Sequence, residues 1–436
     1  MKSNREDIIH EMRASRVETL RLYDWLRDEL DTRRIVHPGF RPMLWHLPHV
    51  GTFEEWWLLI TLQGDPPLAP RYQVLFDPIK TPREESLDLP PRAEMEEYLA
   101  RVRTQVELRY LGKGSAGLPS NKLLENDYVF HMVLEHEYQH QETLSYMLQM
   151  LPPDRKRKPE GATYLEPPVP APRVTPEMVK VPGGPFTLGA SGEPFVYDNE
   201  GPPREVELAE FRIDRYPVTN AEYAEFVAAG GYNDRLLWSE AGWTWKQENE
   251  IARPLYWSAA EPRETQEMFE MRLLVPDFPV TGVSWHEAQA YSRFVGKRLP
   301  SESEWEKAAS REMGATGPGR KRRFPWGEEL PSPQLCNFNG RFLGPTRVGA
   351  FPDGASPVGC LDMAGNVWEW TATTFSGYPG FKAHPYAEYS EIWFDGDHRV
   401  MKGGSWMTRT PLLRTSFRNF FRPGFRFAFA GFRCCS

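Results

Sequence analysis

The spacing of the apolar residues changes at a proline-rich segment, residues 152–177. Before this segment, apolar residues recur at helical spacing in four stretches, at about 4–30, 44–62, 92–111 and 126–150. After it, short strand-like runs alternate with glycine and proline turns. Proline-rich polar segments act as semi-rigid spacers between folded parts. We therefore predict an α+β chain with a four-helix bundle over 1–151, a linker over 152–177 and a turn-rich second domain over 178–436.

Charge and cysteine usage exclude several classes of protein. A net charge of −8 and a pI near 5.8 argue against a nucleic-acid or membrane-surface partner. The charged N-terminus lacks the apolar core of a signal peptide, and no apolar run approaches the ~20 residues that span a bilayer. The four cysteines form no CxxC pair, which argues against a thiolate zinc site and fits a reducing compartment. We expect a cytoplasmic protein without nucleic-acid or membrane partners.

Two helical stretches are expected inside the second domain, at 220–231 and 285–310. The second stretch contains an internal helix-start signal. Ser301 or Ser303 would be the N-cap, and Glu304 or Glu306 the capping-box partner.

The stretch 126–150 carries the clearest candidate for chemistry. It has no glycine or proline, so we predict one continuous helix. His136 and His140 are four residues apart and would lie one turn from each other on one face. Two neutral imidazoles placed in this way can bind one metal ion, and Glu142 could orient one of them. The pair does not locate a third ligand, and the same spacing also arises by chance in helices that bind no metal.

The second domain resembles the formylglycine-generating-enzyme/sulfatase-modifying-factor family, a variant of the C-type lectin fold. The resemblance is carried, in family order, by MVKVPGGPFTLG (178–189), YPVTNAEYAEF (216–226), PVTGVSWHEAQAY (279–291), KRLPSESEWEKAA (297–309), FPWG (324–327), GNVWEW (365–370), KGGSW (402–406) and GFRC (431–434). Formylglycine generation in that family uses a cysteine pair that holds copper. After Gly404 this chain has only Cys434 and Cys435, at its end, so we do not expect that activity.

The first domain resembles the DinB-type four-helix bundle. A DinB-like bundle followed by this second domain is the architecture of the ergothioneine-biosynthesis sulfoxide synthases of the EgtB type. In that family, HxxxHxE supplies two of three iron ligands, which match His136 and His140. The third ligand falls in WHLPHVGTFEE (45–55), where the family pattern favours His49 over its neighbour His46. Three neutral nitrogens suit iron(II), although geometry alone does not exclude zinc.

The resemblance implies a reaction and a substrate site. Iron(II) and O2 would join a chalcogen donor to C2 of the imidazole of hercynine, the Nα-trimethyl form of histidine. A quaternary ammonium cannot donate hydrogen bonds, so aromatic faces satisfy it. The positions that match the family's residues for this group are Gln139, Tyr378, Asn419 and Phe420. The alternative roles are ordinary core for Tyr378 and Phe420 and a turn residue for Asn419.

Three positions depart from the family pattern and bear on the donor. Phe375 stands where a tyrosine donates a proton, so no catalytic side chain is assigned. Phe421 stands where an aspartate binds the donor's charged end. Arg83 matches one member of a basic clamp for the donor, whereas the other member falls on Ser86. A buried charged donor without partners costs several kcal/mol.

The neutral residues at these positions favour a neutral donor, and the selenoneine synthases of the same architecture use a selenosugar. A sulfoxide synthase that takes cysteine or γ-glutamylcysteine stays open. So does a protein of another class, a lectin-like binding module without catalysis.

Overall fold

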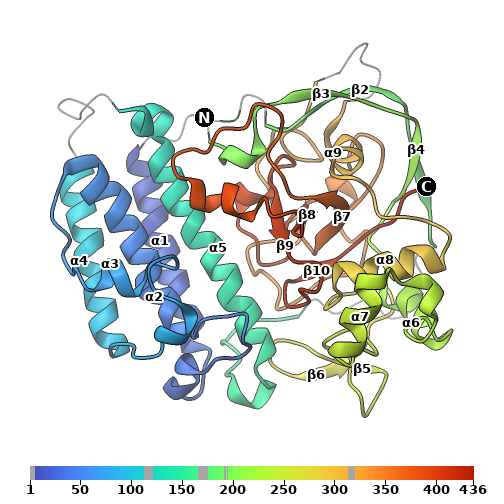
Figure 1. Cartoon of the computed structure of the whole chain (residues 1–436), viewed down its shortest axis with the longest axis horizontal. Coiled ribbons are helices and arrows are strands. Elements are labelled where there is room, and N and C mark those ends of the chain that lie inside the picture. Colours follow the sequence, from blue (N-terminus) through green and yellow to red (C-terminus); the bar gives the residue numbers. More distant parts are fainter. Residues whose placement is uncertain (1–4, 112–120, 165–174, 191–192, 194, 313–319) are drawn as a thin grey trace. The chain divides into compact units, whose positions relative to one another are not determined.

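The computed structural model describes residues 5–111, 121–164, 175–190, 193, 195–312 and 320–436. Within these ranges the chain forms two compact units, Met1–Glu160 and Gly161–Ser436. Each unit is described by itself. The helices and strands are labelled in Figure 1.

The first unit is built from four long helices. They are α1 (Arg5–Asp24), α2 (Met43–Glu55), α4 (Arg92–Tyr110) and α5 (Tyr128–Met150). A π-helical turn, Trp56–Thr61, extends α2, and the short α3 (Tyr72–Leu75) packs against α2. Helix α1 packs on α5 and α4, and α2 packs on α4 and α5, which makes a four-helix bundle (Figure 1).

The expectation that the first helix continues to about residue 30 is wrong. Helix α1 ends at Asp24, and a separate 3-10 turn, Glu29–Arg33, follows. Between them, the backbone N–H of Arg27 donates to the carbonyl of Arg155 at 3.0 Å, and Leu26 forms a β-bridge with Lys156. Pairing with a segment more than a hundred residues away thus replaces the helical hydrogen bonds. The spacing of apolar residues in 4–30 carries no information about this pairing.

Four buried charges tie the helices of the first unit together. Arg16 of α1 donates to Glu137 of α5 at 2.8 Å and to Glu54 of α2 at 3.0 Å. Arg103 of α4 donates to Glu54 at 2.7 and 2.9 Å, and the Thr19 hydroxyl donates to Glu137 at 2.7 Å. Burial alone would raise the pKa of Glu54, but the two guanidinium groups outweigh it and lower that pKa. We call Arg16, Glu54, Arg103 and Glu137 the charge quartet.

The second unit contains a four-stranded sheet in the order β10-β7-β8-β9. Its strands are β7 (Trp368–Thr374), β8 (Arg399–Lys402), β9 (Asn419–Phe421) and β10 (Ala430–Gly431). Strand β10 runs parallel to β7, and the other neighbours are antiparallel. Three two-stranded sheets join β1 (Met178–Val181) to β4 (Phe211–Asp214), β2 (Gly184–Leu188) to β3 (Arg204–Leu208), and β5 (Glu264–Gln266) to β6 (Met271–Leu273).

The helices of the second unit are short. They are α6 (Asn220–Ala228), α7 (Glu240–Glu248), α8 (Trp285–Phe294) and α9 (Glu302–Ser310). The stretch predicted at 285–310 is therefore two helices, because Gly296 adopts a φ of 68° and Pro300 precedes the next start. Ser301 caps α9 and forms the capping box with Glu304, as the start signal predicts. Helix α7 is not evident from the apolar spacing.

The core of the second unit explains why several of its motif residues stand where they do. Glu369, inside GNVWEW, is fully buried because Arg433 donates to it at 2.6 and 2.7 Å and the Trp305 indole N–H donates at 2.7 Å. Gly365 adopts a φ of 75°, and a Cβ there would lie 2.2 Å from the carbonyl oxygen of Asn337. The contacts of Glu369 and Gly365 therefore explain their place in the motif by the requirements of the fold.

The cysteines of the second unit are free and buried. Burial raises the pKa of Cys435 to about 12 and that of Cys434 well above its ordinary value. Both therefore rest as thiols at neutral pH, whereas a metal-binding cysteine is a thiolate. This agrees with a structural role for the terminal pair.

A buried carboxylate in the second unit predicts a pH-dependent stability. Burial would raise the pKa of Glu306, but Lys321 at 2.7 Å and Lys402 at 2.9 Å outweigh it and lower that pKa to about 2. Because the folded-state pKa lies below the unfolded one, the stabilisation is complete above the unfolded pKa and is lost as the pH falls toward the folded value. The stability advantage of the wild type over Glu306→Gln should shrink by about 2 kcal/mol between about pH 7 and pH 3.

Urea unfolding of both proteins across this range measures the effect. Glu210→Gln is the matched control, since Glu210 pairs with Lys180 while its side chain is 57% exposed. An advantage of the wild type over Glu306→Gln that does not change with pH would contradict the prediction.

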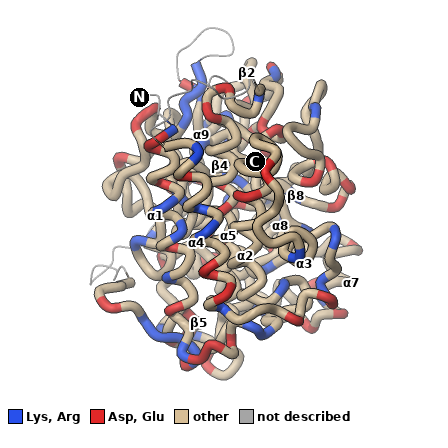
Figure 2. Tube along the Cα trace, turned by 90° about the vertical axis from the view of Figure 1, so that its left-hand side faces the viewer, with Lys and Arg blue, Asp and Glu red and all other residues tan. Residues whose placement is uncertain are grey.

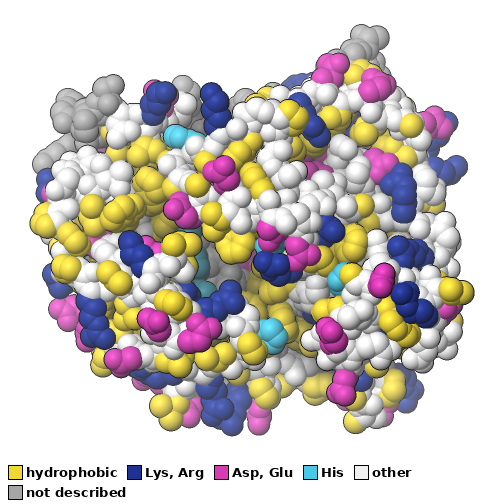
Figure 3. All heavy atoms as spheres, in the orientation of Figure 1, with side chains coloured by type: hydrophobic (Ala, Val, Ile, Leu, Met, Phe, Trp, Pro, Cys, Tyr) yellow, Lys and Arg dark blue, Asp and Glu magenta, His cyan; other side chains and the backbone are white. Residues whose placement is uncertain are grey.

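The surfaces in view carry both signs of charge. Figure 2 shows basic and acidic positions interspersed along the tube, and Figure 3 shows lysine, arginine, aspartate and glutamate side chains mixed with apolar ones. A search of the described helices finds none that is both long enough and apolar enough to span a membrane.

Candidate metal centre

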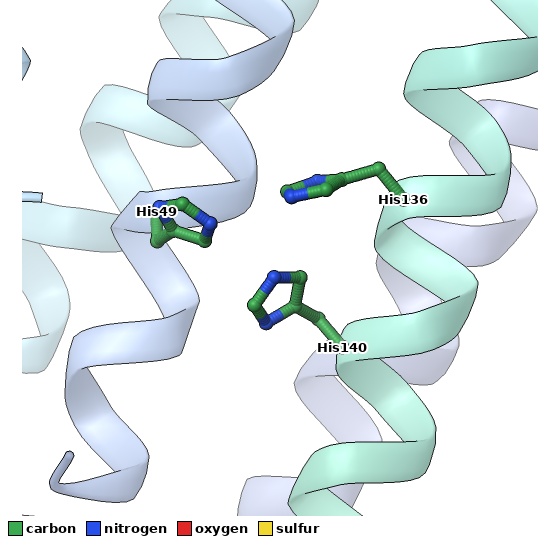
Figure 4. A group of neighbouring side chains, drawn as sticks. All are labelled: His49, His136 and His140. Atoms are coloured by element: carbon green, nitrogen blue, oxygen red, sulfur yellow. The ribbon is translucent and has the colours of Figure 1, made fainter. Parts of the chain in front are cut away.

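Three histidines from two helices meet inside the first unit. His136 and His140 lie one turn apart on α5, and His49 faces them from α2 (Figure 4). One ring nitrogen of each points into the space between the three rings, and these atoms all lie within 4.8 Å of one another. Among the described residues, these three side chains are the histidine, cysteine or acidic groups whose possible ligand atoms lie close enough together to hold one metal ion. The structure thus brings together the three residues predicted as ligands.

The ring of His49 is held by its second nitrogen. The Nδ1 atom of His49 lies 2.7 Å from the carbonyl oxygen of Phe76, which can only accept, so this nitrogen carries the proton. The Trp45 indole stacks on the same ring with centroids 4.5 Å apart. The Nε2 atom is left as the unprotonated nitrogen of a neutral imidazole, the form that binds a metal.

The ring of His136 is held by stacking. It lies on Phe53 with ring centroids 3.7 Å apart and an interplanar angle of 13°. Its Nδ1 atom is buried and has no hydrogen-bond partner among the described residues. His136 therefore lacks an acceptor of the kind that the Phe76 carbonyl provides for His49, and stacking on Phe53 orients its ring.

All the imidazoles of this site are neutral at physiological pH. Burial lowers the pKa of His49 to about 4 and that of His46 to about 3. Burial, together with the neighbouring histidines, also lowers the pKa of His136 and His140 well below the ordinary value. Metal ions bind the neutral ring, so the free site needs to lose few protons before it binds. Three neutral nitrogens without a carboxylate suit iron(II) and also zinc, and they leave further coordination positions open.

The second unit matches a known family model. Residues 166–436 match the family described as a sulfatase-modifying factor enzyme 1-like domain. This confirms the predicted C-type-lectin-like domain of the formylglycine-generating-enzyme type, and with it the α+β class. A formylglycine-generating enzyme of Thermomonospora curvata is 34% identical, over 59% of this chain and 93% of that protein.

Longer matches extend over both units. A hercynine oxygenase of Mycolicibacterium thermoresistibile is 39% identical, over 99% of this chain and 94% of that protein. A hercynine oxygenase of Mycolicibacterium smegmatis is 38% identical, over 98% of each chain. The chain belongs to the hercynine oxygenase family. Membership of the hercynine oxygenase family confirms the resemblance to the EgtB-type architecture.

Two further residues predicted from the hercynine oxygenase resemblance lie in the first unit. Gln139 lies on α5 directly before His140, and its amide is 3.4 Å from the carbonyl oxygen of Glu135. Arg83 is exposed in a short 3-10 turn, Arg83–Glu85. Ser86, at the other clamp position, is fully buried, and its hydroxyl donates to the carbonyl oxygen of Pro82 at 2.9 Å.

The sequence analysis missed one buried cation near the histidines. Arg41 is only 8% exposed, and its guanidinium donates to the Ser86 hydroxyl and to the carbonyl of Thr81 at 2.7 Å. It also lies over the Trp45 ring at 4.5 Å. No spacing in the sequence signals this role, because the acceptors, a hydroxyl and several backbone carbonyls, belong to a loop about 40 residues away.

The remaining predicted residues lie in the second unit. Phe375 is fully buried and stacks on Phe420 with centroids 3.9 Å apart. The Tyr378 hydroxyl donates to Glu302 at 3.0 Å, and the Arg418 guanidinium lies 4.3 Å from the Tyr378 ring and 4.9 Å from that of Phe375.

Two neighbours complete the predicted set. Asn419 accepts a hydrogen bond from the backbone N–H of Phe420 at 2.8 Å, and Phe421 stacks on Phe425 at 4.1 Å. Phe375 and Tyr378 thus lie beside the buried Arg418–Glu302 ion pair, at 2.7 Å, whereas Asn419, Phe420 and Phe421 are half-buried. The substrate roles of the five residues stay predictions.

Proposed function

We propose that this protein is an O2-dependent, non-haem iron(II) enzyme that forms a carbon–chalcogen bond at C2 of the hercynine imidazole. One observation carries the proposal. His49, His136 and His140 converge within 4.8 Å in a chain that matches hercynine oxygenases along 98–99% of its length. A lectin-like binding module would have no use for three neutral imidazoles that face one another.

Bound iron(II) would supply the activation of O2, which organic side chains cannot achieve. The protein's own contribution is to hold three neutral imidazoles in fixed orientations. The Phe76 carbonyl holds the proton of His49 on Nδ1. Stacking on Trp45 restricts rotation of the His49 ring, and stacking on Phe53 restricts that of the His136 ring. In this proposal Gln139, directly before His140, contacts the trimethylammonium group. The roles that the resemblance implies for Tyr378, Asn419 and Phe420 stay predictions, because the Arg418 guanidinium already lies 4.3 Å from the Tyr378 ring and Phe375 stacks on Phe420.

The proposed donor is a neutral selenosugar. Phe421 presents an apolar ring that stacks on Phe425, and Phe375 has no proton to give. The Ser86 hydroxyl is already engaged with Arg41 and Pro82, so it is not free for a carboxylate. An anionic donor buried at neutral positions would lose its hydration without compensation, at a cost of several kcal/mol.

One observation favours a second candidate, a thiol donor such as cysteine or γ-glutamylcysteine. The Arg83 side chain is exposed and forms no hydrogen bond or ion pair with the described residues, although its carbonyl accepts from the Ser86 backbone N–H. A free guanidinium can take a carboxylate in a bidentate contact, and both thiols carry one.

Single-turnover assays distinguish the two donors. Protein loaded anaerobically with iron(II) is mixed with hercynine and with selenoglucose, cysteine or γ-glutamylcysteine, then exposed to O2, and the products are read by mass. Product with selenoglucose supports the proposal. Product only with a thiol refutes the selenosugar donor and supports the second candidate, and no hercynine product with any donor refutes the proposed activity.

A further inference from the structure

A fourth histidine, His46, contacts one of the three. His46 lies one turn before His49 on α2 and is only 7% exposed. Its Nδ1 atom is 2.9 Å from the Nδ1 atom of His140, and the two ring centroids are 5.1 Å apart. The Nε2 atom of His46 is buried and has no hydrogen-bond partner among the described residues.

The contact between the two Nδ1 atoms constrains where the protons lie. A hydrogen bond needs one donor and one acceptor, and a neutral imidazole carries a single proton. If His46 donates, His140 carries its proton on Nε2, and that nitrogen cannot bind a metal. If His140 donates from Nδ1, its Nε2 lone pair is free. Only the second arrangement is compatible with His140 as a ligand through the nitrogen opposite His46.

We propose that His46 is a positioning residue, whose Nδ1 accepts the hydrogen bond from His140 and thereby sets the tautomer and ring orientation in which His140 binds the metal. In the same way, the Phe76 carbonyl accepts a hydrogen bond from Nδ1 of His49 at 2.7 Å. Each of these two ligands thus has an acceptor behind it. The inference rests on the proposed metal centre but not on the identity of the organic substrates.

Cobalt(II) is the probe for this role, because its visible absorption reports the set of ligands as well as the affinity. The test compares His46→Asn, which keeps an acceptor oxygen, with His46→Leu, which has similar size and no acceptor. We expect His46→Leu to bind cobalt(II) about 10–100-fold more weakly than the wild type, with one ion per chain at saturation and unchanged absorption bands. His46→Asn should retain affinity within a few-fold of the wild type.

Each outcome decides the proposal. Equal affinity in the wild type and both variants would overturn it, because no acceptor would then be needed. Altered absorption bands in both variants would also overturn it and make His46 a ligand. If His46→Leu lacks the wild-type circular dichroism, His46→Ala takes its place in the comparison. A wild type that binds no cobalt(II) would refute the metal centre itself, and with it the proposed function.

Discussion

Replacing His136 with alanine is expected to remove the metal and the activity together. The substitution deletes one of three nitrogens that lie within 4.8 Å of one another and leaves two imidazoles on different helices. The loss of an outer partner of a ligand typically costs 10–100-fold in affinity, and we expect the loss of a ligand to cost more than about 100-fold. Iron content after anaerobic loading and hercynine turnover measure the two effects.

His286→Ala is the matched control for this experiment. His286 is also a buried histidine, but it lies on α8 outside the three-histidine group. It should keep wild-type iron content. Stoichiometric iron and full turnover in His136→Ala would contradict the assignment of the ligands. A wild type that takes up no metal would instead support the lectin-like alternative.

Replacing Arg16 with methionine is expected to destabilise the first unit by about 3–5 kcal/mol. Arg16 forms an ion pair with each carboxylate of the charge quartet, at 2.8 Å with Glu137 and 3.0 Å with Glu54. Without it, Glu137 keeps only a 3.9 Å approach from Arg103 and its hydrogen bond from Thr19. A buried carboxylate that loses its cation retains its desolvation cost, and this makes the loss large.

Urea unfolding followed by far-ultraviolet circular dichroism measures this loss, since the first unit is mainly helical. Arg13→Met is the control, because Arg13 lies on the same helix and pairs with Glu107 while its side chain is 54% exposed. An exposed pair of this kind contributes about 0–1 kcal/mol. A similar decrease in the free energy of unfolding in the two variants would show that the charge quartet contributes no more to stability than an exposed ion pair.

The quartet also links the bundle to the metal centre. Glu137 is adjacent to His136 on α5, and Arg16 and Arg103 join it to α1 and α4. Glu54 lies on α2 in the turn after His49. The ion pairs therefore hold α2 and α5, the helices that carry the three histidines, in register. A bundle weakened at Arg16 should consequently also show weaker metal binding, although no ligand has changed.

Local signals in the sequence were enough to predict most of the helices. Helix α4 was predicted to within one residue, and α9 begins at the predicted cap Ser301, because periodicity and capping act within one or two turns. The errors have different causes. The break between α8 and α9 lies at Gly296 and Pro300, which the prediction of one stretch overlooked. The end of α1 depends on pairing with Arg155 and Lys156, which no local pattern contains.

The sequence by itself determined that His136 and His140 share one face of a helix, because the helical repeat places residues four apart one above the other. It also carried the family motifs of the second unit. The family pattern favoured His49 over His46 on α2, but residue spacing alone did not separate them, and only the tertiary structure shows how the two rings lie. The packing of α2 against α5 directs His49 into the space between the rings and places His46 behind His140. The Phe76 carbonyl likewise reaches His49 from a segment that follows α2. The physical reason is that an orienting hydrogen bond depends on distances between segments, and the order of residues along the chain does not specify them.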